Sequence, residues 1–317
     1  MIEPRRPGYY DYPVVRRPVW TWEIPTYFWL GGIAGGAYAT AALAERFGTT
    51  EDRRYTADGF YLAAAAAAAC PPLLIADLGR PERFHHMLRI FKPLSPMNLG
   101  AWVLAAFAPT AVVRAGRHAA DSGRLSRPLA AIARLAPRGM TEIAGTLLGF
   151  ALAGYTGVLL AATNVPLWAK SKLLGGLFMA SALSSGSAGI SLTAARRRAP
   201  DKTLHRLGQI DRAAAVGEIA MLTGYLAQSG RAGRPLFSGR LAPAFWAGAA
   251  ASTVMPLLLH GAAASSSGKT LRRLSTAAAA SSLLGALALR WSIFEAGKPS
   301  SEDQRASFEL SENAEPK

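Results

Sequence analysis

Residues 77–102 read DLGRPERFHHMLRIFKPLSPMNLGAW and join two long apolar segments. Gly79 permits a tight turn and Pro81 cannot continue a helix, so the first apolar segment must end near Asp77. Within residues 80–92, apolar side chains recur at helical spacing with basic residues between them. An amphipathic segment of this length is too short to span a bilayer and is typical of a membrane surface. The stretch therefore predicts one spanning helix, an interfacial helix and a second spanning helix, which Ser95 to Asn98 could cap.

The composition supports an integral membrane protein. The chain has 317 residues, of which 50% are hydrophobic, and a formal net charge of +15. A basic protein could bind nucleic acid, but here the arginine clusters flank apolar runs, as they do in membrane loops, so we expect no nucleic acid and contact with membrane lipid. The single cysteine, Cys70, lies inside an apolar run and is predicted to be a packing residue.

We predict an all-α integral membrane protein with about eight transmembrane helices, arranged as two four-helix bundles, and one interfacial amphipathic helix. The expected spans are residues 24–47, 56–76, 97–115, 140–163, 172–194, 204–227, 241–263 and 274–294. Residues 1–23 form an extramembrane tail without the apolar core of a signal peptide. The first bundle is 24–163, including the interfacial segment 80–92, and the second is 164–294. The polar, acidic segment 295–317 is expected to be disordered.

Lys and Arg are more numerous in the connections that follow the first, third, fifth and seventh expected spans. The positive-inside rule places these connections in the cytoplasm and both termini outside. The N-terminal tail, residues 77–98 and residues 164–170 would then share the outer face, where a partner protein could dock.

The two membrane-boundary motifs point to a known family. The motif DLGRPERF at 77–84, followed by KPLSPMNLGAW at 92–102, and the segment WTWEIPTYFWLGGIAGGAY at 20–38 resemble the NrfD/PsrC family (polysulfide reductase membrane subunit type). The resemblance is good over residues 18–190. It implies a bacterial inner-membrane anchor subunit that exchanges electrons with menaquinone or ubiquinone. The implied partners are a four-cluster ferredoxin-like iron–sulfur subunit and a molybdopterin or multihaem catalytic subunit.

Ionisable groups at membrane depth are costly and therefore mark candidate functional sites. Glu23 and Tyr27 are four residues apart, on one face of the first helix, and could exchange protons with a quinone, with Trp22 packing near its ring. The family resemblance implies a quinone pocket at these two positions, completed by Tyr155, although the best-known member has an Asn/His pair there. The alternative for the pair is interfacial anchoring. Tyr155 could instead be a hydrogen-bonded core tyrosine.

Two further sets of polar residues have alternative interpretations. Asp77 could accept a quinol proton, or satisfy the N–H groups of its turn. The segment after it could form a basic docking surface or a solvated face on lipid phosphates; its members are Arg80, Arg83, His85, Arg89 and Lys92. Ionisable residues in later helices could form a proton path or merely pair structurally; they are Glu142, Asp211, Glu218, His260 and Arg290.

The sequence predicts no cofactor held by this chain itself. One histidine, His260, lies near the middle or inner part of an expected span and the other four lie at span ends or in loops, whereas a b-type haem with two axial histidines needs two such residues. We find no Cys-x-x-Cys and no clustered carboxylates with metal-ligand spacing, so no haem, iron–sulfur cluster or metal is expected. The leading hypothesis is thus a quinone-binding anchor subunit that is not a catalyst on its own. The alternatives are a structural tether without quinone chemistry and a proton-translocating or transport module. A repeat-type transporter would show related halves, which 24–163 and 172–294 do not.

Overall fold

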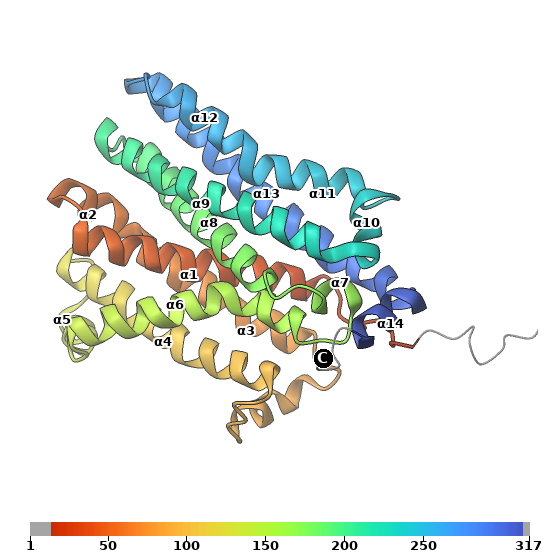
Figure 1. Ribbon diagram of the computed structural model, residues 1–317. Coiled ribbons are helices and arrows are strands. Elements are labelled where there is room, and N and C mark those ends of the chain that lie inside the picture. Colours follow the sequence, from red (N-terminus) through yellow and green to blue (C-terminus); the bar gives the residue numbers. More distant parts are fainter. Residues whose placement is uncertain (1–13, 313–317) are drawn as a thin grey trace, which may run out of the picture.

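The computed structural model describes residues 14–312, and these residues form helices and connecting turns without a β-strand (Figure 1). The prediction of an all-α protein is confirmed for this part of the chain. The long helices are α1 (Glu23–Phe47), α3 (Asp58–Ala76), α4 (Pro96–Asp121), α6 (Arg138–Ala161), α8 (Leu174–Arg196), α9 (Asp201–Ser229) and α13 (Gly268–Glu302). A further long segment combines α11 (Ala242–Ala249), the π-helical turn η4 (Ala250–Val254) and α12 (Met255–Ala263).

Shorter helices lie at the two ends of these long elements. They are α2 (Thr50–Thr56), η2 (Pro81–Leu88), α5 (Arg127–Arg134), α7 (Pro166–Ala169), η3 (Gly230–Gly233), α10 (Arg234–Phe237) and α14 (Gln304–Glu312). Helix α5 and the last turns of α4 occupy the connection between the expected spans 97–115 and 140–163. Because α5 has an apolar side, its Ala130 is buried while its arginines remain near solvent.

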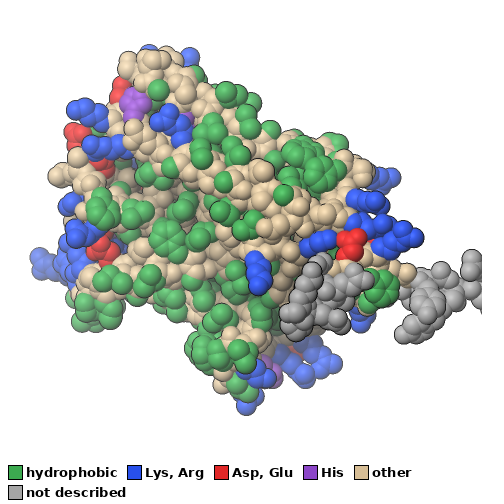
Figure 2. Space-filling view, in the orientation of Figure 1, with side chains coloured by type: hydrophobic (Ala, Val, Ile, Leu, Met, Phe, Trp, Pro, Cys, Tyr) green, Lys and Arg blue, Asp and Glu red, His purple; other side chains and the backbone are tan. Residues whose placement is uncertain are grey.

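Within residues 14–312, six helical segments are long and apolar enough to cross a membrane. They are Thr50–Ala76, Pro96–Asp121, Arg138–Ala161, Leu174–Arg196, Ala242–Ala263 and Gly268–Glu302. The other two expected spans form helices α1 and α9, but neither is among these six. Figure 2 shows hydrophobic side chains over the middle of the molecule and most Lys and Arg side chains toward its ends, as expected for a protein surrounded by lipid.

Helix α1 lies in the middle of the molecule and packs against α3, α6 and α8 (Figure 1). Its glycines permit this position. A Cβ atom at Gly35 would overlap the carbonyl oxygen of Gly149 on α6, and a Cβ atom at Gly36 would overlap that of Ala182 on α8. Small residues at these contacts let helix backbones approach closely.

Hydrogen bonds to one side chain hold the connection between α3 and α4. Residues 81–88 form the 3₁₀ helix η2 rather than an α-helix. Asn98, in the first turn of α4, holds this connection through its side-chain amide, which accepts from the Lys92 N–H at 2.7 Å and donates to the carbonyls of Met87 at 2.7 Å and Ile90 at 3.0 Å. The expected interfacial segment is therefore fixed to the next helix by an asparagine, whereas the side chain of Ser95 does not cap that helix.

The prediction of a disordered C-terminal tail is wrong for residues 295–312, which form the end of α13 and, after Asp303, helix α14. Asp303 caps α14 through the N–H groups of its first turn and accepts from Arg231 Nε at 3.0 Å. Lys170 Nζ forms an ion pair with Glu309 at 2.8 Å. Burial opposes ionisation of Asp303, but these hydrogen bonds and the Arg231 charge outweigh it and lower the pKa of the carboxyl. Residues 1–13 and 313–317 of the expected tails lie outside the described residues.

Candidate functional site

Two carboxyl groups meet at the end of the molecule where α1 begins and α3 ends. Glu23 lies in the first turn of α1 and accepts a hydrogen bond from the hydroxyl of Thr21. Asp77, the residue that follows α3, accepts from the backbone N–H of Thr21 and interacts electrostatically with Glu23. Burial raises the pKa of Asp77, and the negative charge of Glu23 raises it further, against the hydrogen bond from Thr21. A carboxyl in this environment is suited to holding and releasing a proton.

Tyr27 lies one turn deeper on α1 and is buried, with its ring 5.7 Å from that of Phe28. It lies close enough to Cys70 and Tyr155 to interact with both electrostatically. Cys70 is buried and its thiol donates to the Ala66 carbonyl at 3.2 Å, so the prediction of a packing residue is confirmed. The structure thus brings Tyr27 and Tyr155 toward each other from α1 and α6.

The Tyr155 hydroxyl donates to the carbonyl of Pro96 at the start of α4. Its ring covers Gly100, where a Cβ atom would overlap the ring atoms. This is the contact that we described as the alternative for Tyr155, namely a core tyrosine hydrogen-bonded across helices. This hydrogen bond fixes the start of α4 against α6.

The tryptophans near this end have unequal environments. Trp22, the expected ring-packing residue, is 56% exposed. Trp20 instead stacks on Trp168 with ring centroids 6.2 Å apart, and Trp168 stacks on Phe294 at 5.7 Å. Trp168 is fully buried and donates through Nε1 to the Ile293 carbonyl at 2.9 Å. We did not predict this role; the apolar turn that carries Trp168, at 164–168, was the available signal.

The predicted basic docking segment is exposed along its length: this holds for Arg80, Arg83, His85, Arg89 and Lys92. Apolar side chains on the same segment are exposed as well, with Phe84 at 45%, Phe91 at 57% and Leu94 at 96%. None of the five basic residues forms an ion pair within residues 14–312. The segment therefore offers free cations and apolar contacts together.

A second polar cluster lies inside the later helices. Asp211 on α9 is buried and contacts His260 on α12, with Oδ2 and Nε2 2.8 Å apart. Its carboxyl also accepts from Ser184 on α8 at 2.6 Å and from Ser282 on α13 at 3.1 Å. Because groups from four helices surround its carboxyl, Asp211 faces the protein interior rather than lipid.

Glu218 and Arg290 extend this cluster, and both are fully buried. Arg290 donates to Ser181 Oγ at 2.8 Å and to the Phe178 carbonyl at 3.0 Å. Ser181 also interacts with the Glu218 carboxyl, which accepts from Ser252 at 2.9 Å. Ser252 lies in the π-helical turn η4. Of the five ionisable residues singled out in the sequence, four thus meet in one network.

Glu142 is not part of this network. It lines a separate cavity of about 280 Å³ with Arg46 and Phe47, where the end of α1 meets the start of α6. Among the described contacts none joins Glu142 to the other four residues, so the arrangement does not support a proton path through all five.

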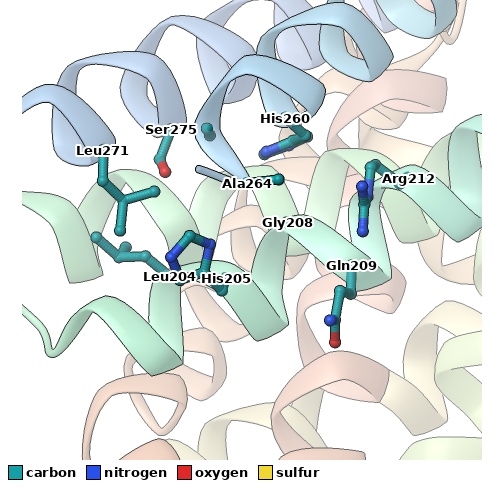
Figure 3. A pocket seen from close by; sticks show the side chains of 10 residues that line it. Leu204, His205, Gly208, Gln209, Arg212, His260, Ala264, Leu271 and Ser275 are labelled. Atoms are coloured by element: carbon teal, nitrogen blue, oxygen red, sulfur yellow. The ribbon is translucent and has the colours of Figure 1, made fainter. Parts of the chain in front are cut away.

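A cavity of about 190 Å³ adjoins the buried network at His260 (Figure 3). His260 projects from α12 and Ser275 from α13, over residues of α9 that include His205, Gln209 and Arg212 (Figure 3). Because His260 lines this cavity and also contacts Asp211, it connects the cavity with the buried carboxyl. Chemically, this arrangement can pass a proton between the cavity and the interior.

The long apolar helices, with buried polar clusters between them, define a multi-pass membrane protein. The family model described as "Polysulphide reductase, NrfD" matches residues 13–299, and the chain belongs to this family. It is also similar to a curated protein from Wolinella succinogenes that is named as the C chain of polysulfide reductase, with 32% identity over 182 residues. That match covers 54% of this chain and 56% of the relative, so it spans little more than half of either protein. Within residues 14–312, no group of three or more His, Cys, Asp and Glu side chains is placed to hold a metal ion.

Proposed function

We propose that this chain is the quinone-reactive membrane anchor subunit of an oxidoreductase complex. The observation that carries the proposal is the Glu23–Asp77 carboxyl pair at the boundary of the apolar helices, one turn from buried Tyr27. The similar protein from Wolinella succinogenes is named as one chain of polysulfide reductase, and this name implies that the enzyme has further chains. The subunit would exchange electrons between the quinone pool and an iron–sulfur partner and would not catalyse a reaction alone.

The Glu23–Asp77 pair and the residues around it fit a quinone, which accepts two electrons and two protons when bound. Its ring oxygens need hydrogen-bonding groups, at least one of which can exchange a proton. Asp77, whose pKa is raised by burial, would hold a proton closer to neutral pH than an ordinary aspartate does. Glu23 would exchange that proton with the outside, and Tyr27 would donate from the inner side. Exposed Trp22 would cover the ring, and Tyr155 would form the wall of the pocket through its bond to Pro96.

The finer architecture belongs to the same proposal. We infer eight spans, with α1 and α9 included, in bundles of residues 24–163 and 164–294. Within the first proposed bundle α1 packs against α3 and α6, and within the second α13 packs against α8, α11 and α12; α1 and α6 also pack against α8 and so join the two bundles. The chain would lie in a bacterial inner membrane with both termini outside. A four-cluster ferredoxin-like subunit, attached to a molybdopterin or multihaem subunit, would dock on the exposed cationic and apolar segment 80–94.

The test is quinone-analogue binding to the purified chain and quinone-linked turnover of the assembled complex. We expect Glu23→Gln, Tyr27→Phe and Asp77→Asn each to weaken binding, and Asp77→Asn to lower turnover by about 100-fold or more, as loss of a proton-transfer group does. Glu142→Gln is the matched control, because it removes a carboxyl at the opposite end of α1. Full turnover in all three variants would refute the quinone site and favour a structural tether.

A second candidate function, proton translocation, is favoured by one observation: the buried Asp211–His260 pair opens through His260 to a cavity. An ionisable residue inside a membrane protein is costly, and a passive tether would gain nothing from a buried carboxyl that a cavity reaches. The test is proton uptake by the complex reconstituted in sealed vesicles. Asp211→Asn should abolish proton movement while quinone turnover continues. Unchanged proton movement in that variant would exclude this path.

A further inference from the structure

A strongly basic cavity lies between the end of α8 and the start of α13. Its volume is about 510 Å³. It is lined by Ala195 and five cationic residues, Arg196, Arg198, Lys269, Arg272 and Arg273. Two helix connections distant in sequence therefore place like charges around one hollow, which is electrostatically unfavourable unless an anion is present.

The five cations have no counter-charge of their own. Within residues 14–312, none of them takes part in an ion pair, and the Nε atom of half-buried Arg272 has no hydrogen-bond partner. The adjacent Arg197 differs, because its guanidinium pairs with Asp58 at 2.5 Å. The five cations of the basic cavity thus differ from Arg197 in having no ion-pair partner among the described residues.

An apolar groove begins where the basic cavity ends. The groove has a volume of about 530 Å³ and lies between α1, α3, α8 and α13. Arg196 lines both spaces. The groove follows α8 through Thr193, Leu192 and Gly189, and on α3 it is lined by alanines that include Ala65. A cationic site at the end of the helices therefore continues into an apolar channel along their length.

We propose that these two spaces bind one anionic phospholipid, with its phosphate among the five cations and an acyl chain in the groove. Basic pockets between transmembrane helices suit lipid phosphates, and an apolar groove between helices suits a hydrocarbon chain. A free phosphate has the same anionic chemistry, but it would leave the groove without an occupant. The bound lipid would contact all four helices that line the groove, α1, α3, α8 and α13. It would therefore stabilise the junction between them.

The experiment measures thermal unfolding of the full chain in detergent during titration with phosphatidylglycerol. Phosphatidylcholine with identical acyl chains and inorganic phosphate are the comparison ligands. We expect phosphatidylglycerol alone to raise the unfolding temperature in a saturable way. Arg196→Gln/Arg272→Gln should weaken its apparent affinity about 30-fold, since each basic residue contributes several-fold to binding of an anionic lipid. The matched control is Arg53→Gln/Lys202→Gln, which removes two exposed cations outside the cavity and should leave the affinity unchanged.

A second pair of variants tests the groove without altering charge. Ala65 is exposed and lines the groove, so Ala65→Phe should fill it and weaken phosphatidylglycerol binding. Ala68, exposed on the same helix outside the groove, gives the control Ala68→Phe. Equal stabilisation by phosphatidylcholine would refute the headgroup site. Equal stabilisation by inorganic phosphate, or no difference between the two phenylalanine variants, would show an anion site without a lipid.

Discussion

Replacement of Arg290 by methionine tests the buried network most directly. Methionine fills much of the same space but removes the charge and three hydrogen bonds, to Ser181 at 2.8 Å and to the carbonyls of Phe178 at 3.0 Å and Ala286 at 3.3 Å. It also removes the cation–π contact with the Phe178 ring, whose centroid lies 5.2 Å from the guanidinium. Glu218 would then stay buried without the nearby positive charge that it has in the wild-type protein.

The burial of both charges sets the expected loss of stability. Removing one partner of a buried charged pair costs about 3–5 kcal/mol, because the remaining charge is uncompensated. In the double variant Glu218→Gln/Arg290→Met no such charge remains. We therefore expect the double variant to lose at least about 2 kcal/mol less than the sum of the two single losses, as coupled neighbours do.

The assay is equilibrium unfolding of the purified chain in mixed micelles by added SDS, followed by tryptophan fluorescence. Arg240→Met is the matched control, because Arg240 is exposed, and its cost should stay within about 0.5 kcal/mol. Losses for Glu218 and Arg290 that add within about 0.5 kcal/mol would refute the coupling. A cost below about 1 kcal/mol for Arg290→Met would show that the arginine does not support the helix core.

Three further predictions follow from single positions. Gly36→Ala should lower the free energy of unfolding by about 1–3 kcal/mol, because its methyl group would overlap the carbonyl of Ala182; Gly139→Ala, at a position with open space, is the control in the same thermal assay. Because burial raises the pKa of Asp77, its ionised form destabilises the fold, so Asp77→Asn should be more stable than wild type at pH 7, with the difference vanishing below about pH 4 in unfolding experiments. The lowered pKa of Asp303 has the opposite effect on stability, so Asp303→Asn should be less stable than wild type at pH 7. Wild type should lose this advantage as the pH falls through the folded-state pKa of Asp303, and hydrogen exchange of α14 measures the difference.

The helices were predictable because lipid leaves the backbone little choice. A chain in a bilayer must satisfy its hydrogen bonds internally, so long apolar runs become helices. The expected segment 24–47 is helical as Glu23–Phe47, and 241–263 is helical from Ala242 to Ala263. The helical tail at 295–312 was not predictable from its polar composition, because it depends on contacts with the distant residues Lys170 and Arg231.

The site was predictable only as a set of residue types. Ionisable residues in apolar helices stand out in a sequence, but spacing shows facing pairs only within one helix. The Glu23–Tyr27 spacing could therefore be interpreted, whereas the contact of Asp211 with His260 joins residues on different helices. For the same reason the sequence did not show that Glu142 lies apart from the others.

The contacts between the carboxyl end and the buried network determine whether quinone chemistry and proton movement are separable. Phe28, the neighbour of Tyr27, packs its ring 6.2 Å from that of Phe178, and Arg290 lies over the Phe178 ring as its cation–π partner. Among the described contacts, this link consists of aromatic rings, so it can transmit a change in packing. We expect the proposed quinone site to exchange its protons through Glu23 and Asp77 at the near end. Loss of the Asp211 carboxyl would then stop only proton movement through the later helices, and quinone turnover would continue.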